Sequence, residues 1–228
     1  MKSSPCQTIV TLSESRSAAV SEASAGASLL AGCYGFCRGG KPVVGPVFLH
    51  SGTAKLILVT GKNGKGKTSL LAGIAGMLEW HPQIATRPLL PPRGDIIWVG
   101  HAAPVLPGRR VGDLLSLDAA LLGARDDDAR RAADYFSLPW SAECAALSQG
   151  WRRRLDLARL RLAPARRLWL VDEPFDLLDS DGAELVARAL REHLAAPGNA
   201  AILALPDGEE VDSAVSRIGS ENLLRCPL

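Results

Sequence analysis

The stretch Gly61–Thr68 constrains this chain more than any other, because it reads GKNGKGKT and fits the pattern G-x-x-x-x-G-K-[ST]. The apolar run Lys55–Thr60 before it is predicted to be a strand, and Ser69–Leu78 after it a helix. Between a strand and a helix, the glycines let backbone N–H groups surround a phosphate, and the helix N-terminus adds partial positive charge. The stretch therefore predicts a loop that binds a nucleoside triphosphate, in preference to a glycine-rich surface turn.

Two side chains of this loop have predicted roles of their own. Lys67 is expected to reach the β- and γ-phosphates, and the Thr68 hydroxyl is expected to bind Mg²⁺. The other positions are expected to contact the nucleotide through the loop and the first turn of the helix. The predicted nucleotide-binding residues are Gly61, Lys62, Asn63, Gly64, Lys65, Gly66, Lys67, Thr68 and Ser69.

Composition narrows the class of protein. The 228 residues are 47% hydrophobic and 22% charged, which is typical of one globular domain with a sizeable core. The net charge of +2 is too balanced for a nucleic-acid binder, so no nucleic-acid partner is expected. The run Arg152–Arg154 lies near acidic residues and is interpreted as a solvated helix face. No apolar run approaches the ~20 residues of a membrane-spanning helix, so any membrane role must come through a partner.

The chain is predicted to consist of a short extension and one domain. Residues 1–28 are rich in Ser and Ala and are predicted to be a disordered extension, with an organelle presequence as the alternative. Residues 29–228 are predicted to form the domain. Within it, short apolar runs punctuated by Gly and Pro predict small strands in residues 29–60, and residues 103–150 are predicted to be a helical subdomain.

Three later segments complete the predicted core. Asp95–Gly100, Leu168–Val171 and Ala200–Leu205 read as buried strands, and the third is predicted to be the last clear core strand. Helical segments alternate with them. This alternation predicts an α/β fold with a mostly parallel sheet flanked by helices, and it places the triphosphate at the carboxyl ends of the strands.

Two acidic residues, Asp172 and Glu173, directly follow the strand Leu168–Val171. A buried strand would deliver Asp172 beside the glycine-rich loop, where its carboxylate is predicted to hold Mg²⁺ jointly with Thr68. Glu173 is predicted to be the catalytic residue, because its carboxylate can polarise an attacking water at the γ-phosphate. Many strands end in an acid, so this prediction depends on the loop being present as well.

A second helix N-terminus is predicted at Ser148–Gly150, between the glycine-rich loop and Asp172 in the sequence. Ser148 can cap the amphipathic helix Arg152–Leu162, and Gly150 permits a close approach of another backbone. The segment is therefore a second helix N-terminus suited to phosphate, with a plain capped helix as the alternative. Its predicted contact residues are Ser148, Gln149 and Gly150.

The segments GKNGKGKT, LSQGW followed by RRRLDLARL, and LWLVDEPFDLLD together resemble an ATP-binding-cassette (ABC) ATPase in order and spacing, over residues 30–205. More narrowly, Trp98–His101 and Asp172–Phe175 are similar to the ATP-binding subunit of the haem exporter of cytochrome c biogenesis. The resemblance implies a P-loop NTPase core with a small antiparallel β subdomain and a short helical subdomain. It also implies that ATP and Mg²⁺ are the cofactors.

The same resemblance implies an assembly. Two ATPase subunits would form a homodimer or a heterodimer, in which each ATP touches Gly61–Thr68 of one subunit and Ser148–Gly150 of the other. Asp179 would fall in the segment that crosses the dimer interface. Integral-membrane transporter subunits are the implied partners, and the implied location is peripheral, on the cytoplasmic face of the inner membrane.

The sequence departs from the family's pattern at two positions that bear on hydrolysis. The family places a glutamine after the strand that ends near Gly100, where this chain has His101 followed by two alanines. It also places a histidine at the end of the last core strand, where this chain reads Leu205–Asp207. His101 is the candidate substitute for the glutamine. Losing one such contact costs roughly 10²–10³ in rate, so the sequence predicts an ATP binder with slow ATPase activity.

The sequence leaves further interpretations of the adenine contact and of the function open. The position of the aromatic residue that stacks on adenine in the family holds Arg38, although Tyr34 and Phe36 lie nearby. A catalytically impaired module would use ATP only to gate dimerisation, which the two missing residues favour. A P-loop kinase or GTPase is a weaker alternative, because no Asn-Lys-x-Asp segment for guanine occurs and Ser148–Trp151 would go unexplained.

Overall fold

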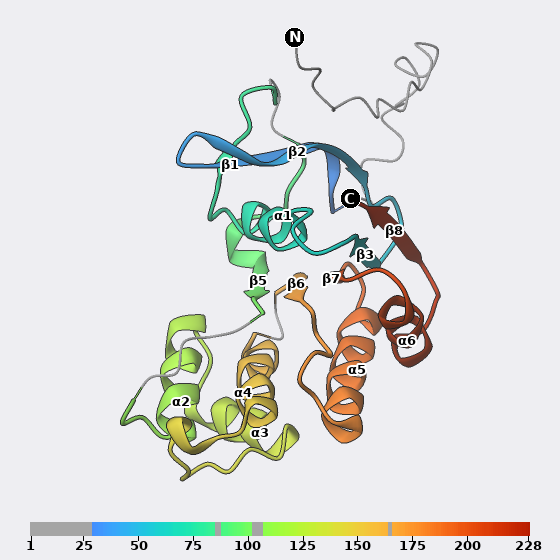
Figure 1. Cartoon of the computed structure of the whole chain (residues 1–228). Helices are drawn as coiled ribbons and strands as arrows, with labels where there is room; N and C mark the ends of the chain where they lie inside the picture. Colours follow the sequence, from blue (N-terminus) through green and yellow to red (C-terminus); the bar gives the residue numbers. More distant parts are fainter. Residues whose placement is uncertain (1–28, 85–87, 102–106, 164–165) are drawn as a thin grey trace.

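The computed structural model of the chain describes residues 29–84, 88–101, 107–163 and 166–228 (Figure 1). The predicted extension, residues 1–28, lies outside the described residues. Among those described, five parallel strands form a central sheet in the order β5-β6-β7-β3-β8. In chain order they are β3 (Leu56–Thr60), β5 (Ile96–Val99), β6 (Leu168–Asp172), β7 (Ala200–Leu205) and β8 (Leu223–Pro227).

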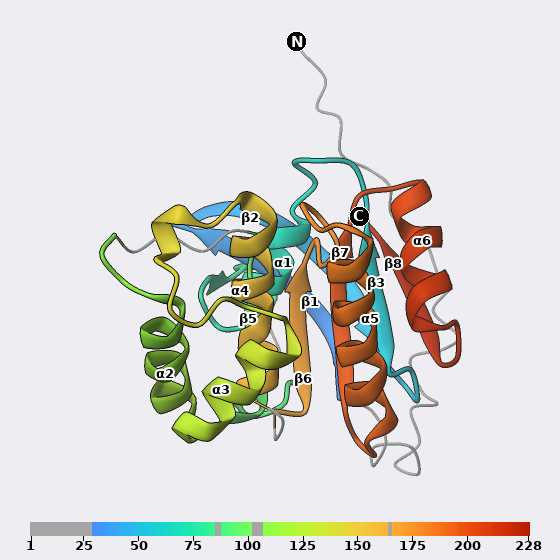
Figure 2. The same ribbon diagram turned by 90° about the horizontal axis from the view of Figure 1, so that it is seen from below.

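Helices cover both faces of this sheet. They are α1 (Lys67–Ile74), α2 (Val111–Leu122), α3 (Asp126–Tyr135), α4 (Gln149–Leu162), α5 (Ser180–Ala195) and α6 (Glu209–Ile218), with short 3-10 turns at Arg93–Asp95 and Cys144–Ala146. Figures 1 and 2 show α2 and α3 gathered with α4 at one end of the molecule, and α5 and α6 beside each other at the other. The predicted α/β fold is confirmed, and α2 and α3 supply the short helical part that the family resemblance implied.

A small antiparallel sheet lies on the α1 side of the central sheet. It consists of β1 (Ala31–Arg38), β2 (Lys41–His50) and β4 (Glu79–Trp80), in the order β2-β1-β4. Helix α1 packs between the two sheets, and the ring of Phe36 on β1 lies against Gly73 of α1, where a Cβ would be 2.2 Å from the ring. The antiparallel subdomain implied by the family resemblance is therefore present.

Alternate strand residues enter two cores, because successive side chains of a strand point to opposite faces. In β6, Trp169 and Val171 pack among the residues of α2 to α6. Leu168 and Leu170 face the other way and pack with α1 and the antiparallel sheet. A strand buried on both faces has to be apolar throughout, which explains the continuous apolar run that predicted it.

One predicted element needed correction, and one strand was not predicted. The helix after the glycine-rich loop was predicted at Ser69–Leu78, but α1 begins at Lys67 and ends at Ile74, and Gly76 follows with a φ of 83° that no helix continues through. Ala200–Leu205 was predicted to be the last clear core strand, and β8 adds an edge strand beside β3 that the sequence did not indicate. Being at the edge of the sheet, β8 is only partly buried, so it lacks the apolar run that marks the inner strands.

No helix in the described part of the chain is both long and apolar enough to cross a membrane.

Candidate nucleotide-binding site

The glycine-rich loop connects the carboxyl end of β3 to the N-terminus of α1. Gly66 caps α1 with a φ of 96°, in the left-handed region that favours glycine. A Cβ at Gly66 would lie 2.9 Å from the carbonyl oxygen of Val43, so the loop fits against β2 only without a side chain there. The backbone conformation and the close packing therefore both require glycine at this point of the motif.

Lys67 is a buried cation, 5% exposed, at the start of α1. Its ammonium group donates hydrogen bonds to the carbonyl oxygens of Gly61, at 2.6 Å, and Lys62, at 3.3 Å. The side chain therefore folds back over the loop that carries it. Phosphate oxygens bound inside the loop would compete with these carbonyls for the ammonium group, which is the arrangement that the predicted role of Lys67 requires.

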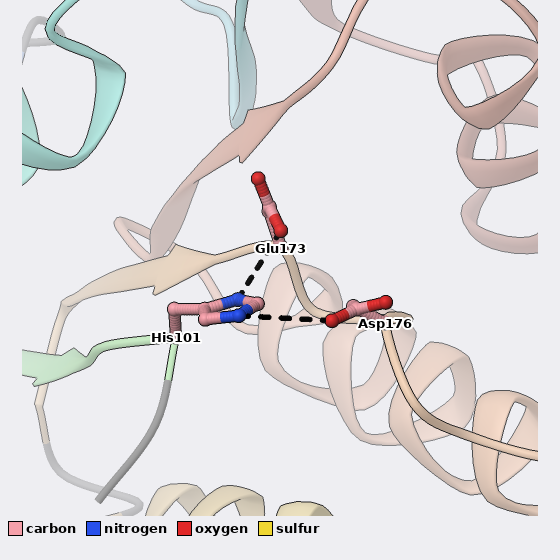
Figure 3. A group of neighbouring side chains, drawn as sticks. All are labelled: His101, Glu173 and Asp176. Carbon is pink, nitrogen blue, oxygen red and sulfur yellow. Dashed lines mark ion pairs between the residues drawn. The ribbon is translucent and has the colours of Figure 1, made fainter. Parts of the chain in front are cut away.

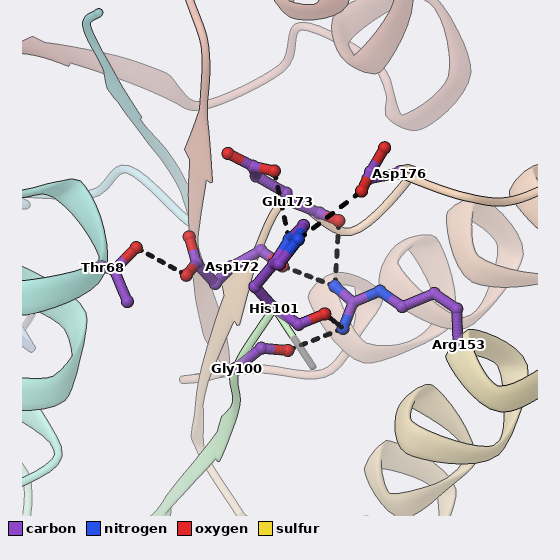
Figure 4. A network of polar contacts seen from close by, with 7 residues as sticks. All are labelled: Thr68, Gly100, His101, Arg153, Asp172, Glu173 and Asp176. Carbon is purple, nitrogen blue, oxygen red and sulfur yellow. Dashed lines mark hydrogen bonds and ion pairs between the residues drawn. The ribbon is translucent and has the colours of Figure 1, made fainter. Parts of the chain in front are cut away.

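Thr68 and Asp172 meet although they are far apart in the sequence, because β3 and β6 run in parallel and end at the same edge of the sheet (Figure 4). The Thr68 hydroxyl donates to Oδ2 of Asp172 at 2.7 Å. Asp172 is 1% exposed, and its Oδ1 is buried without a hydrogen-bond partner. A buried carboxylate oxygen usually has a partner, and a divalent cation would supply one. The two residues thus fit the predicted Mg²⁺ site.

Glu173 follows Asp172 in a strained backbone conformation. Its φ is 47°, which costs a residue with a Cβ about 1–2 kcal/mol. The turn carries the Glu173 carboxylate out of the strand direction and towards His101, whose Nδ1 lies 3.2 Å from Oε2 of Glu173 (Figure 3). Nε2 of His101 lies 3.8 Å from Oδ2 of Asp176. The imidazole of His101 therefore stands between two carboxylates, at the position where the family pattern has its glutamine.

The ligand atoms of His101, Glu173 and Asp176 lie within 4.8 Å of one another. This spacing is compatible with a divalent cation as well as with the two ion pairs. Because Glu173 is already the predicted base of the neighbouring site, we interpret the three side chains as part of that site and not as a separate metal site.

An open cavity of about 670 Å³ joins these parts, a volume in the usual range for a small-molecule site. Its lining includes Val43, Asn63, Gly64, Gly66, Lys67, Thr68, Ser69, His101, Asp172 and Glu173. The structure thus brings most of the predicted loop residues together with both predicted acids. Their roles in binding and catalysis remain predictions.

The second helix N-terminus, Ser148–Gly150, lies at the start of α4. Ser148 caps the helix by accepting a hydrogen bond from the Trp151 backbone N–H at 3.4 Å. Ser148 and Gln149 are solvent-exposed, so the chain itself does not cover them. Gly150 lies against the loop after β6, where an added Cβ would be 2.9 Å from the carbonyl oxygen of Leu177. Ser148 and Gln149 are therefore free to face a second molecule, while Gly150 packs against its own chain.

The run Arg152–Arg154 was interpreted as a solvated helix face, and for two of its residues this was wrong. Arg153 is 2% exposed and Arg154 is 7% exposed. Arg154 donates to the carboxylate of Asp179, which also caps α5, and this hydrogen bond holds the pKa of Asp179 below its usual range. The guanidinium of Arg153 reaches four backbone carbonyl groups at the ends of β5 and β6. The acidic residues near this run in the sequence did not indicate that Arg153 and Arg154 are buried against distant partners.

The aromatic residues near Arg38 do not face the cavity. Tyr34 and Phe36 are both fully buried, and the Tyr34 hydroxyl donates to the carbonyl oxygen of Leu89 at 2.6 Å. Arg38 itself is exposed at the end of β1. Among the described residues, Val43 is the apolar side chain that the small sheet contributes to the cavity lining. The adenine position of the family therefore has no aromatic counterpart in this part of the chain.

The loop after β7 brings negative charge towards the cavity instead of a histidine. Residues 207–210 are exposed, and α6 starts with Glu209 and Glu210. Partial burial raises the pKa of Glu210, and repulsion from Glu173 and Asp176 raises it further, while Lys67 lowers it. Glu210 lines a neighbouring surface pocket together with Phe175 and Asp176. The edge of the site next to β7 is consequently acidic.

Comparisons with known proteins show which family and fold this chain resembles. The sequence model of a family described as ABC transporter matches residues 47–176. The cytochrome c biogenesis ATP-binding export protein CcmA of Cupriavidus necator is 38% identical over 187 residues, which cover 76% of this chain and 81% of that protein. The protein of the same name from Bradyrhizobium diazoefficiens is 35% identical over 190 residues, which cover 80% and 93%.

Solved structures share the fold. A putative ABC transporter ATP-binding protein from Pyrococcus furiosus has a TM-score of 0.64 at 23% identity, covering 79% of this chain and 92% of its own. A second structure, described as an ATP binding subunit of an ABC transporter, has a TM-score of 0.69 at 16% identity, covering 86% and 85%. At these identities the similarity establishes the fold.

Proposed function

Because the chain belongs to the ABC transporter family and is similar to CcmA proteins over most of its length, we propose that it is the ATP-hydrolysing subunit of an exporter that handles haem in cytochrome c biogenesis. The observation that carries this proposal is the meeting of Thr68 and Asp172 beside the glycine-rich loop, with one buried carboxylate oxygen of Asp172 still without a partner. This is the arrangement that an ATP-bound Mg²⁺ requires.

Each residue of the site has a defined part in hydrolysis. The loop N–H groups and Lys67 bind the β- and γ-phosphates. Mg²⁺ held by Thr68 and Asp172 would neutralise charge on the phosphate oxygens. Glu173 accepts a proton as the water oxygen bonds to the γ-phosphorus and the bond to the β–γ bridging oxygen breaks, which releases ADP and inorganic phosphate.

The active form is a dimer of ATPase subunits, a homodimer or a heterodimer. The exposure of Ser148 and Gln149 at the N-terminus of α4 supports this part of the proposal, because a capped helix start with free N–H groups is suited to phosphate. The ATP in the cavity of one subunit would be closed off by Ser148, Gln149 and Gly150 of the other. Integral-membrane subunits would receive the closing motion through the helical subdomain and would hold the protein at the cytoplasmic face of the inner membrane.

Turnover by the isolated protein is slow. Two features support this: the loop after β7 offers acidic residues where the family has a histidine, and His101 pairs with the Glu173 carboxylate that would accept the proton. The loss of one preorganised contact to the reacting phosphate or water costs roughly 10²–10³ in rate. ATP binding is less affected, since the loop, Lys67 and the Thr68–Asp172 pair are all in place.

The decisive experiment measures ATP turnover by the purified protein with and without its membrane subunits. Lys67→Ala should abolish both ATP binding and turnover, whereas Glu173→Gln should keep ATP binding and lower turnover by about 10²-fold or more. His50→Gln, at an exposed histidine of β2, is the matched control and should change neither.

Two outcomes would overturn parts of this proposal. ATP-dependent dimerisation that Glu173→Gln leaves unchanged would select the nucleotide-gated module instead of an ATPase. Normal cytochrome c maturation in a strain without the gene would remove the haem-export role and leave the ATPase assignment intact.

A further inference from the structure

Arg153 is an unusual residue within the described part of the chain, because it is a long cationic side chain that is only 2% exposed. It belongs to α4, the helix that Ser148 caps. Burial lowers the pKa of its guanidinium, although several nearby carboxylates act in the opposite direction. Removing a cation from water is costly, so a buried arginine needs a dense set of acceptors.

The acceptors of Arg153 are four backbone carbonyl oxygens from two loops of the site (Figure 4). Nη1 donates to Gly100 at 2.6 Å and to His101 at 3.1 Å. Nη2 donates to Asp172 and, at 2.9 Å, to Glu173. One planar group therefore joins the end of β5 to the end of β6, which the two parallel strands bring side by side. A guanidinium suits this task because its donors form a rigid fork.

Two of the bonded carbonyls belong to His101, the candidate substitute for the family's glutamine, and to Glu173, the predicted base. The Glu173 backbone, at a φ of 47°, is anchored by Arg153 at its carbonyl and by its own N–H, which donates to the carbonyl oxygen of Ala204 at 2.9 Å. A strained turn of this kind persists when its surroundings fix it from several sides. Loss of the guanidinium would let Glu173 relax and would release the loop that carries His101.

We propose that Arg153 is a positioning residue for hydrolysis, which sets the Glu173 carboxylate by holding the backbone turn beneath it and the neighbouring loop at Gly100. It acts through Glu173 and makes no contact with ATP. This inference rests on the proposed ATPase function and adds to it a role for a residue of the segment RRRLDLARL that the sequence alone gave no part in hydrolysis. It also means that α4, whose N-terminus is exposed for a second subunit, is the helix that fixes the catalytic turn of its own subunit.

The test separates ATP binding from hydrolysis in the full chain. Arg153→Gln should leave the dissociation constant for a fluorescent ATP analogue with Mg²⁺ within about threefold, because the loop and Lys67 are untouched, and should lower the single-turnover rate at least about tenfold. Arg153→Lys, which keeps the cation but has a single nitrogen to share among four carbonyls, should give an intermediate rate. Arg152→Gln removes the neighbouring arginine, which bonds one carbonyl, at Ala145, and should leave both quantities unchanged.

A second measurement excludes a purely structural role. In a Glu173→Gln background, Arg153→Gln should cause no further loss of the residual rate, because the group that it positions is already gone. An equal loss in both backgrounds, or a parallel fall of affinity and rate, would overturn the inference. If Arg153→Gln does not fold, Arg153→Lys carries the test, and wild-type kinetics from that variant would overturn it.

These outcomes can be told apart from failure of the proposed function. A wild-type protein that does not hydrolyse ATP even with its membrane subunits would overturn the ATPase assignment and this inference together. A wild-type protein whose hydrolysis depends on Lys67 but is indifferent to Arg153 would overturn this inference alone.

Discussion

Lowering the pH from 7 to 5 should destabilise this protein through one buried histidine. His193 on α5 is 6% exposed, and its ring stacks on Trp169 with the centroids 3.9 Å apart and the planes 13° apart. Nε2 lies 3.1 Å from the carbonyl oxygen of Ala200, and the Asn199 amide nitrogen lies 3.2 Å from Nδ1. These partners suit a neutral ring that donates at Nε2 and accepts at Nδ1. Burial lowers the pKa of His193 from 6.5 to about 4.

The size of the effect follows from this shift. Because the pKa is lower in the folded state, the unfolded chain binds more protons between pH 6.5 and pH 4, so stability falls as the pH falls through this window. Integrating from pH 7 to pH 5 gives a loss of about 2 kcal/mol from this single group. For a domain of this size, the melting temperature should fall by about 4–8 °C.

Urea unfolding at the two pH values measures the loss directly. Carboxylates also titrate in acid, so the quantity to compare is the pH 7 to pH 5 difference in wild type and in His193→Phe, which keeps a ring on Trp169. The variant should lose about 2 kcal/mol less than wild type over this range, whatever its stability at pH 7. His50→Gln, at an exposed histidine, should behave like wild type. Equal losses in wild type and His193→Phe would refute the reasoning.

Three further substitutions test the site and its support. Asp172→Asn should weaken ATP binding at least about tenfold with Mg²⁺ and little without it, as seen by titration with and without a chelator; equal weakening in both would argue against a metal ligand. Gly66→Ala should weaken ATP binding about tenfold or more, because the Cβ would lie 2.9 Å from the Val43 carbonyl oxygen at a φ of 96°; unchanged affinity would show that the loop adapts. Gly73→Ala should lower the unfolding free energy by about 1–3 kcal/mol because of the Phe36 ring, and Phe36→Leu should recover part of it in the double variant.

The sequence could predict elements whose signal is local. The loop at Gly61–Thr68 is read from glycines and a lysine at fixed spacing, and β6 from an apolar run that two buried faces require. Because Asp172 is the last residue of β6 and parallel strands end at one edge of a sheet, its carboxylate is then expected near Thr68. The boundaries of α1 were less predictable, because Gly76 ends the helix in a stretch whose remaining residues suit one.

The number of strands in the central sheet could not be predicted from local sequence patterns either. Strand β8 lies at the edge of the sheet and is only partly buried, so it does not need a continuous apolar run. The sequence of Leu223–Pro227 therefore has no pattern that distinguishes it from a loop. The sequence likewise does not show that Tyr34 and Phe36, which lie near Arg38 in the chain, are both part of the core. Which side of β1 faces α1 is decided by packing between the two sheets.

The sequence by itself determined the glycine-rich loop, the acids Asp172 and Glu173 at the end of an apolar strand, and the α/β class, because each depends on backbone conformation or periodicity within one segment. Only the tertiary structure decided that His101 faces Glu173 and that Arg153 is buried against four carbonyl groups. Those contacts join residues from β5, β6 and α4, which are separated by up to 73 residues between Gly100 and Glu173 (173 − 100 = 73). Such contacts exist only once the parallel strands have brought their ends together, and no spacing in the sequence encodes them.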